Sequence, residues 1–247
     1  MRLFCIALLC ASWLRAETDQ KALDWLHKAQ EQAGGADALA AIHDVRQKRQ
    51  MRSLVAGVTA EQTLTYVVPK ALKQESALPF GKVIVFVDAD GGWMNGPQGQ
   101  IDLPPPQRKQ ADGELFRIRE ALLLADRLED REVHFLREAE DEGRQAVVLE
   151  VAAKQGGETA QVWIDKESGD FSKLAYEGIV LAGKPPLVEE RFSDFREIEG
   201  VRVPYKTAIH QNGPLLTEVT VIELELNTGV TVEELARKPK PPAAPAP

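Results

Sequence analysis

The sequence predicts an α+β fold: one large antiparallel sheet with one or two helices on one face. Three observations predict it. Residues 188–205, VEERFSDFREIEGVRVPY, have the pattern of two strands joined by a tight turn at Glu199-Gly200, where glycine supplies a positive φ. Turn residues recur at short spacing from Glu142 to Pro214 without helical patterns between them, which is typical of a meander of strands. An apolar helical pattern in the middle of the chain can cover one face of such a sheet.

The composition indicates a globular protein and excludes some partners. The chain has 247 residues, of which 44% are hydrophobic and 28% charged, so it can bury a core. A formal charge of −8 argues against nucleic acid as the main partner and against electrostatic docking on anionic membranes. Residues 96–106 are the only candidate linker, and they resemble a loop more than a boundary. We therefore expect a single domain.

The first sixteen residues, MRLFCIALLCASWLRA, have the pattern of an export signal, with an apolar run over Leu3–Leu9 and a small residue at Ala16. A short packed helix is the alternative. We expect cleavage after Ala16 and a soluble periplasmic protein rather than one that is lipid-anchored at Cys10. Cleavage would also remove Cys5, leave no disulfide, and take the formal charge to −10. No later segment is apolar for long enough to form a transmembrane segment.

The first half of the mature chain begins with helical patterns and continues with strands. Residues 22–41 predict a helix and a second short helix, separated at Gly34-Gly35. Strand patterns follow over residues 46–52, 59–68, 74–78 and 82–87. In the last of these both alternating sets of side chains are apolar, so we expect it to be covered on both faces.

A turn at residues 88–92 and a loop up to Pro106 precede the clearest predicted helix, Asp112–Leu128. Asp112 is a plausible N-cap. The helix is apolar over more than half of its circumference, which exceeds what a surface helix needs.

The second half of the chain has strand patterns and a proline-rich end. Residues 236–247, ARKPKPPAAPAP, predict a disordered tail without a core of its own. The strand patterns lie over residues 133–137, 146–152, 158–164, 171–176, 206–211 and 215–226, besides the hairpin.

No motif for catalysis, metal binding or cofactor binding is present in the sequence. The four histidines have no ligand spacing, and there is no nucleophile elbow, Walker loop or dinucleotide fingerprint. Asp88 and Asp90 resemble part of a calcium loop, but the other ligands are missing and a plain turn is favoured. We therefore expect no enzyme, no metal and no cofactor.

The predicted helix is apolar over more than half of its circumference, and the strand at residues 82–87 is apolar on both faces. Together they indicate an apolar ligand pocket, although an ordinary core would give the same pattern. Both interpretations stay open at this stage. The candidate residues for lining such a cavity are Trp93, Met94, Leu115, Ile118, Leu122, Val83 and Val85.

Two segments carry a resemblance to a known family. One contains Ile164, Asp165, Ser168 and Gly169, where Ile-Asp and a Ser-Gly turn join two strands. The other is the predicted hairpin over residues 188–205, with an aromatic-Asp-aromatic strand, a glycine turn and a Val-Pro strand, at Phe192, Asp194, Phe195, Gly200, Val203 and Pro204. Together with the glycine pair near the start, they resemble periplasmic proteins of the LolA/LolB-like superfamily, the outer-membrane lipoprotein-sorting type.

The resemblance implies one LolA-like domain over residues 17–235, with a strongly curved open half-barrel sheet and helices over its concave face. It further implies a hydrophobic cavity that carries lipid or the acyl chains of lipoproteins. An arginine at the cavity mouth would hold a lid, and Arg46, Arg49 and Arg52 are equal candidates for it.

Two other functions remain as alternatives. The chain could be an envelope sensing or scaffold module that binds a protein partner with the same fold, because a proline-rich tail can tether or present a domain. A hydrolase with scattered catalytic residues is the third hypothesis, and no motif supports it.

Overall fold

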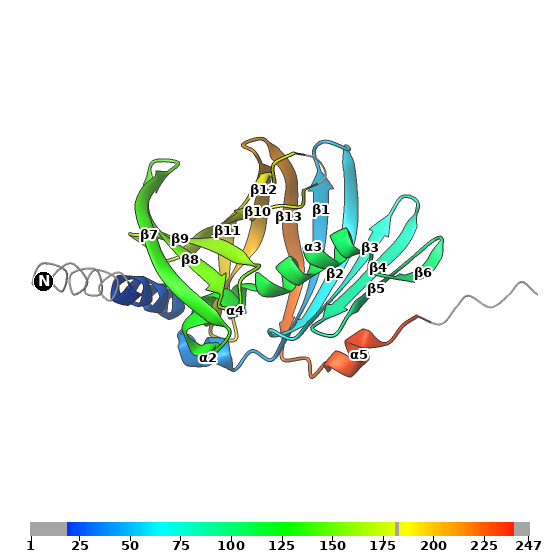
Figure 1. Cartoon of the computed structure of the whole chain (residues 1–247), viewed down its shortest axis with the longest axis horizontal. Coiled ribbons are helices and arrows are strands. Elements are labelled where there is room, and N and C mark those ends of the chain that lie inside the picture. Colours follow the sequence, from blue (N-terminus) through cyan, green and yellow to red (C-terminus); the bar gives the residue numbers. More distant parts are fainter. Residues whose placement is uncertain (1–18, 181–182, 240–247) are drawn as a thin grey trace, which may run out of the picture.

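The computed structural model describes residues 19–180 and 183–239, and these form one open, curved sheet with short helices packed on it (Figure 1). The sheet has 13 strands, and every neighbouring pair is antiparallel. The expected export signal, residues 1–16, lies outside the described residues, as do residues 240–247 of the expected tail. In sheet order the strands are β6 (Gly99–Asp102), β5 (Gly92–Gly96), β4 (Gly81–Asp88), β3 (Ala71–Leu78), β2 (Val58–Val67), β1 (Asp44–Ser53), β13 (Leu215–Leu226), β12 (Val201–Gln211), β11 (Leu187–Ile198), β10 (Phe171–Glu177), β9 (Thr159–Asp165), β8 (Arg144–Ala153) and β7 (Arg131–Asp141).

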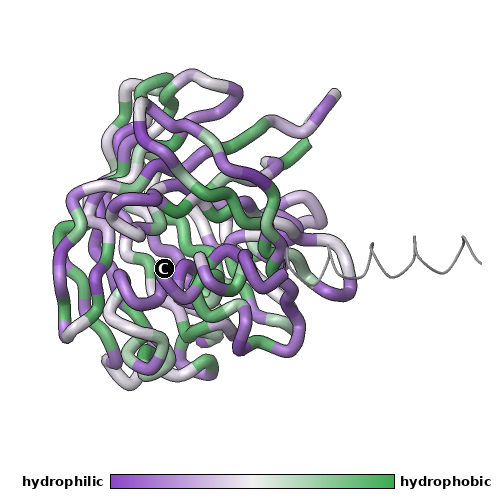
Figure 2. Tube along the Cα trace, turned by 90° about the vertical axis from the view of Figure 1, so that its left-hand side faces the viewer, coloured by the Kyte–Doolittle hydropathy of each residue, from purple (hydrophilic) through white to green (hydrophobic). Residues whose placement is uncertain are grey.

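The predicted hairpin at residues 188–205 is confirmed as the turn between β11 and β12. Glu199 and Gly200 both have positive φ, 51° and 79°, as a two-residue hairpin turn requires. Val201, Val203 and Tyr205 are buried on one face of β12. Hydrophobic and hydrophilic residues also alternate along other strands (Figure 2). This alternation gives the sheet one concave face that buries side chains and one convex face that is largely solvated.

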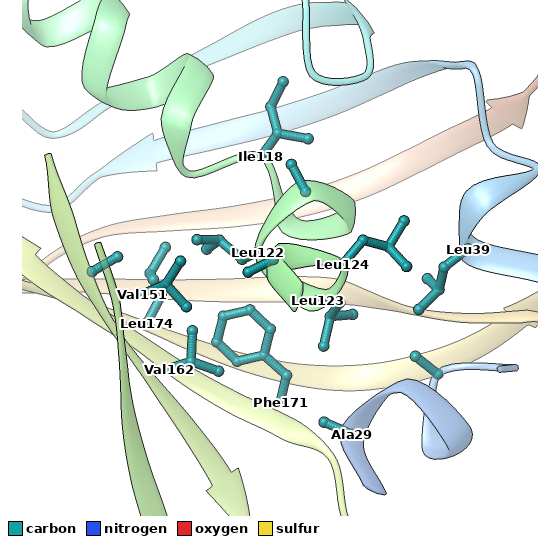
Figure 3. Packing of buried hydrophobic residues seen from close by; sticks show 14 of the residues in the cluster. Ala29, Leu39, Ile118, Leu122, Leu123, Leu124, Val151, Val162, Phe171 and Leu174 are labelled. Atoms are coloured by element: carbon teal, nitrogen blue, oxygen red, sulfur yellow. The ribbon is translucent and has the colours of Figure 1, made fainter. Parts of the chain in front are cut away.

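All of the described helices except the C-terminal one cover parts of the concave face. They are the N-terminal helix (described over residues 19–32), α2 (Ala36–Ala40), α3 (Pro105–Phe116), α4 (Arg119–Leu123) and the 3₁₀ turn η1 (Ala125–Arg127). Leu122 and Leu123 of α4 are fully buried and pack with Phe171 of β10 and Leu39 of α2 (Figure 3). The main hydrophobic core therefore lies between these helices and the concave face of the sheet.

The prediction of one helix over Asp112–Leu128 is wrong, because this segment belongs to three shorter elements. α3 begins at Pro105, where a proline loses no intrahelical hydrogen bond, and Asp112 lies inside it and pairs with Arg108. The chain leaves the helical conformation at Ile118, with φ −50° and ψ 124°. This break turns α4 toward the core and buries Ile118, so tertiary packing overrides the helical pattern.

Residues 96–106, which the sequence predicts to be a loop, contain the turn and second strand of the β5–β6 hairpin and the start of α3. β5 pairs with β4, and β6 forms the edge of the sheet. Every residue of β6 is exposed, so no alternation of apolar and polar side chains marks it in the sequence.

The prediction that the apolar strand at residues 82–87 is covered on both faces is confirmed only in part, because Val83 and Val85 on its concave face are half-buried. Val87 joins the main core, whereas Phe86 packs on the convex face with Trp93 and with Leu235 of α5 (Val232–Ala236). The expected tail boundary at residue 236 is therefore corrected, because Ala236 is the last residue of a helix packed on the sheet. None of the helices in the described residues is both long and apolar enough to cross a membrane.

Candidate functional site

A cavity of about 460 Å³ lies between α3, α4 and the concave face of the central strands, within the size range of ligand pockets. It lies beside the packed core of Figure 3, and Ile118 belongs to both. Strands β1–β3 and β10–β13 supply its wall and floor. Its lining residues are Gln47, Arg49, Met51, Gln62, Leu64, Tyr66, Leu72, Gln74, Gln110, Glu114, Arg117, Ile118, Arg119, Glu120, Phe171, Leu174, Tyr176, Glu190, Phe192, Val203, Pro204, Thr207, Ile209, Val219 and Val221.

The alternation of β1 decides which of the three candidate arginines faces this cavity. Gln47, Arg49 and Met51 line it. Arg46 and Arg52 point to the convex face, where they pair with glutamates of β13. Arg49 is thus the arginine that β1 presents to the cavity, and its hydrogen bonds go to the sheet rather than to α3 or α4.

A polar network surrounds Arg49 on the concave face of β1–β3. Its Nε donates to Oε1 of Gln62 at 3.0 Å, and its Nη2 donates to Oε1 of Gln74 at 3.2 Å. Gln62 in turn donates to Oγ of Ser76 at 3.0 Å. Burial lowers the pKa of Arg49, and the charges of Glu114 and other acidic neighbours oppose this. This half of the wall therefore carries a half-buried cation whose hydrogen bonds go to neutral amides.

At the floor of the cavity, charged groups connect the sheet to α4. The hydroxyl of Tyr66 donates to Oε2 of Glu120 at 3.1 Å, and Nη2 of Arg119 donates to the carbonyl oxygen of Arg202 at 2.9 Å. Burial and the neighbouring Glu120 raise the pKa of Tyr66 well above its usual value. Burial lowers the pKa of Arg119, and the charge of Glu120 opposes it.

Tyr176 of β10 lines the opposite side of the cavity and contacts two charged residues. Its hydroxyl donates to Oε1 of Glu190 at 2.7 Å, and the guanidinium of Arg117 lies over its ring, 3.7 Å from the centroid. Arg117 also pairs with Glu158 at 3.3 Å. Burial and the charge of Glu190 raise the pKa of Tyr176.

Strands β12 and β13 contribute no charged side chain to the lining. The residues they supply are Val203, Pro204, Thr207, Ile209, Val219 and Val221. The cavity is therefore amphipathic: amide and guanidinium groups lie on β1–β3, and a mostly apolar strip lies on β12 and β13.

Three of the seven predicted cavity residues come from the predicted helix, and one of these lines the cavity. Ile118 is that residue. Leu122 is fully buried in the main core, and Leu115 packs against the same core.

The other four predicted residues come from β4 and β5. Val83 and Val85 lie opposite Ser76 and Gln74 of β3, and Met94 lies opposite Val85. The two valines and Met94 are therefore on the concave face, but they do not line the cavity. Trp93 lies on the convex face, where its ring stacks on Phe86 with centroids 5.8 Å apart and its Nε1 donates to the carbonyl oxygen of Ala236.

Sequence reasoning missed the polar part of the site. A signal was present, because Gln47 and Arg49, Gln62 and Gln74 occupy alternating positions in strands where an apolar inner face is expected. In the described residues no three His, Cys, Asp or Glu side chains come together in a way that could hold a metal ion.

Neither a protein-family model nor a curated protein matches the sequence. Solved structures do match the fold. A putative outer membrane lipoprotein-sorting protein domain from Vibrio parahaemolyticus is similar with a TM-score of 0.56 and 16% identity, over 88% of this chain and 97% of that one. A LolA superfamily protein from Nitrosomonas europaea is similar with a TM-score of 0.59 and 14% identity, over 87% and 97%.

A DUF1329 family protein from Desulfovibrio piger is similar with a TM-score of 0.55 and 11% identity, over 85% of this chain and 95% of that one. At these identities the likeness establishes the fold and not the function. The fold is LolA-like, as the two sequence motifs predict.

Proposed function

We propose that this protein is a periplasmic, non-enzymatic carrier that holds a lipid, or the acyl chains of a lipoprotein, in the cavity between the curved sheet and helices α3 and α4. The observation that carries this proposal is the cavity of about 460 Å³ with its uncharged strip along β12 and β13. The LolA-like fold and the export pattern of residues 1–16 support it.

Apolar burial supplies enough free energy for such a ligand. Each buried methylene contributes about 0.8 kcal/mol, so about ten methylenes contribute roughly 8 kcal/mol before the entropic costs of binding. The strip of Val203, Ile209, Val219 and Val221 offers the apolar contacts for this burial.

Two neighbouring residues of β13 give a matched test. Val221 lines the cavity, whereas Ile222 is 56% exposed on the convex face. Val221→Trp fills the cavity with an indole ring, and Ile222→Trp adds the same ring outside it. We expect Val221→Trp to abolish displaceable binding of a fluorescent fatty acid and Ile222→Trp to bind like the wild type.

Native mass spectrometry of the purified protein gives an independent measurement. We expect co-purified lipid with the wild type and with Ile222→Trp, and less of it with Val221→Trp. Equal binding by both variants would place the ligand outside the cavity. Repeated purification without lipid, together with no binding of the fluorescent fatty acid, would overturn the proposal.

A further inference from the structure

Large apolar side chains are exposed at one end of the curved sheet, where strands are joined in pairs. Val55 is 76% exposed in the β1–β2 turn, and Phe80 is 68% exposed in the β3–β4 turn. In the described part of the chain, the other exposed large apolar residues at this end lie at the β1–β2 turn and the β10–β11 connection. We call the whole set the apolar rim, and its members are Leu54, Val55, Phe80, Val180 and Leu187. Single exposed apolar side chains need no explanation, whereas a set gathered at one place marks a contact surface.

The connections that carry the apolar rim are neighbours in the sheet and are tied to one another (Figure 1). They close consecutive hairpins in the run β4-β3-β2-β1-β13-β12-β11-β10. The amide of Leu54 donates to the carbonyl oxygen of Leu216 at 2.8 Å, which joins the β1–β2 turn to β13. The amide of Leu187 donates to Oδ1 of Asn212 at 2.9 Å, which joins the β10–β11 connection to the β12–β13 turn. The apolar tips are therefore held in one row along the ends of these strands.

The apolar rim is almost free of charge. The described residues of its connections, 54–57, 79–80, 178–180, 183–186 and 212–214, contain one charged side chain, Lys184. At the opposite end of the sheet, the β2–β3 and β11–β12 connections contain Lys70 and Glu199. The next connection beyond the rim, between β8 and β9, carries Lys154 and Glu158. Binding through the rim would therefore be driven by the removal of apolar side chains from water and not by charge.

The wall of the cavity comes close to the apolar rim on two strands. Met51 of β1 lines the cavity three residues before Leu54, and Glu190 of β11 lines it three residues after Leu187. Three residues of a strand span roughly 10 Å. A ligand that moves from the cavity toward this end of the sheet therefore meets the rim within about the length of a short acyl chain.

We infer that the apolar rim docks on the surface of a zwitterionic lipid bilayer, where its side chains enter the boundary between head groups and acyl chains. The inference rests on the proposed function, because docking brings the cavity to a source or destination of its lipid. Separate apolar tips along the ends of several strands suit a fluid surface, which needs no complementary shape. The near absence of basic residues at the rim and the formal charge of −8 favour a zwitterionic surface over an anionic one.

The test places a tryptophan on the rim and uses phosphatidylcholine vesicles with bromine atoms on the acyl chains, which quench an indole that enters the bilayer. Val55→Trp is the rim variant. Ile222→Trp is the matched control, because Ile222 is an exposed aliphatic residue within β13 on the convex face. We expect brominated vesicles to quench Val55→Trp more than the wild type, and Ile222→Trp no more than the wild type. The readout must be local, since the apolar run at residues 3–9 could enter a bilayer by itself.

A second substitution shows whether the rim binds as one surface. In the Val55→Trp background, Phe80→Asp should raise the lipid concentration at half-maximal quenching about tenfold, because a large apolar side chain no longer leaves water. Ile222→Asp in the same background should leave this concentration unchanged. Phe80 and Ile222 are both exposed, so thermal melting should show that both variants fold. Vesicles that also contain phosphatidylglycerol should not bind more tightly.

The outcomes separate bilayer docking from the carrier function. Equal quenching of Val55→Trp and Ile222→Trp overturns the inference, and the carrier function stands if a fluorescent fatty acid still binds. Tighter binding to vesicles with phosphatidylglycerol overturns it as well, because docking would then be electrostatic. Self-association that Val55→Asp abolishes, without extra quenching of Val55→Trp, would show that a second copy covers the rim. Extra quenching of Val55→Trp in a protein that binds no fatty acid overturns the carrier function and leaves the docking.

Discussion

A Cβ atom placed on Gly34 would lie only 2.2 Å from the carbonyl oxygen of Gly200. The turn after the N-terminal helix is therefore in direct backbone contact with the hairpin turn between β11 and β12. The amide of Arg202 donates to the carbonyl oxygen of Ala33 at 3.0 Å at the same place. Two segments that carry the family resemblance thus meet in space, and together they fix the N-terminal helix to the sheet.

Gly34→Ala should destabilise the protein more than Gly35→Ala. Both glycines have positive φ, 114° and 97°, so alanine strains the backbone at either position by about 1–3 kcal/mol. Only at Gly34 must the backbone also move away from Gly200, since a Cβ on Gly35 meets no atom within 4 Å. Urea denaturation measures both free energies of unfolding. Equal losses would show that the close contact does not constrain the fold.

Tyr66→Phe should lower the free energy of unfolding by about 1–3 kcal/mol, because it leaves the buried carboxylate of Glu120 without its donor. The double variant Tyr66→Phe with Glu120→Gln should recover part of this loss, since the uncharged amide costs less to bury. Chemical denaturation of the single and double variants gives the coupling. Additive losses would mean that this hydrogen bond does not join β2 to α4.

Strands could be predicted from the sequence wherever one face is buried and a turn residue ends the strand. The β11–β12 hairpin satisfies both conditions, and its turn at Glu199-Gly200 is where the pattern places it. β6 fails the first condition, because it is an exposed edge strand. The break at Ile118 also has no local signal, since only packing in the hydrophobic core makes it favourable.

The candidate site was harder to predict, because facing residues come from separate strands. Ile118 could be identified from the apolar helical pattern, and it lines the cavity. Arg49, Gln62 and Gln74 come together only through the register of β1, β2 and β3, which a single sequence does not define. The position of Trp93 could not be predicted either. Its side chain is covered by α5, and the sequence does not indicate this helix, because its buried residue Leu235 stands next to the proline-rich tail.

Leu235→Ala should destabilise the protein by about 2–5 kcal/mol, as expected for removing a buried leucine. Leu235 is 4% exposed and packs on Phe86 and Trp93, so its loss uncovers the convex face of β4 and β5. Chemical denaturation measures the change, and a red shift of tryptophan emission reports exposure of the indole. Arg237→Ala, at an exposed position after α5, is the control. Unchanged stability of Leu235→Ala would show that α5 does not hold the sheet.

A second ionic cluster lies outside the cavity and predicts how stability depends on pH. Lys173 is 3% exposed and lies between Asp141, at 2.9 Å, and Glu189, at 3.0 Å. Its ammonium also sits 3.4 Å from the ring centroid of Trp163. Arg191 donates to Asp141 from both terminal nitrogens of its guanidinium. One carboxylate, Asp141, therefore connects the end of β7 to cations on β10 and β11.

Burial favours the neutral form of Asp141, but hydrogen bonds from Arg191 and Lys173 outweigh it and hold the pKa of this carboxyl below its usual range. A lowered folded-state pKa stabilises the protein above the unfolded-state pKa of about 3.9, and this contribution is lost as the pH falls through the folded-state value. Asp141→Asn should therefore cost on the order of 2 kcal/mol at neutral pH, and its difference from the wild type should shrink below about pH 3.9. Urea denaturation over this pH range measures it. Asp37→Asn is the control, because the Asp37 side chain is 99% exposed and its ion pair with Arg127 at 3.1 Å is therefore weak. A difference that stays constant to the lowest pH would mean that the cations do not hold Asp141 ionised.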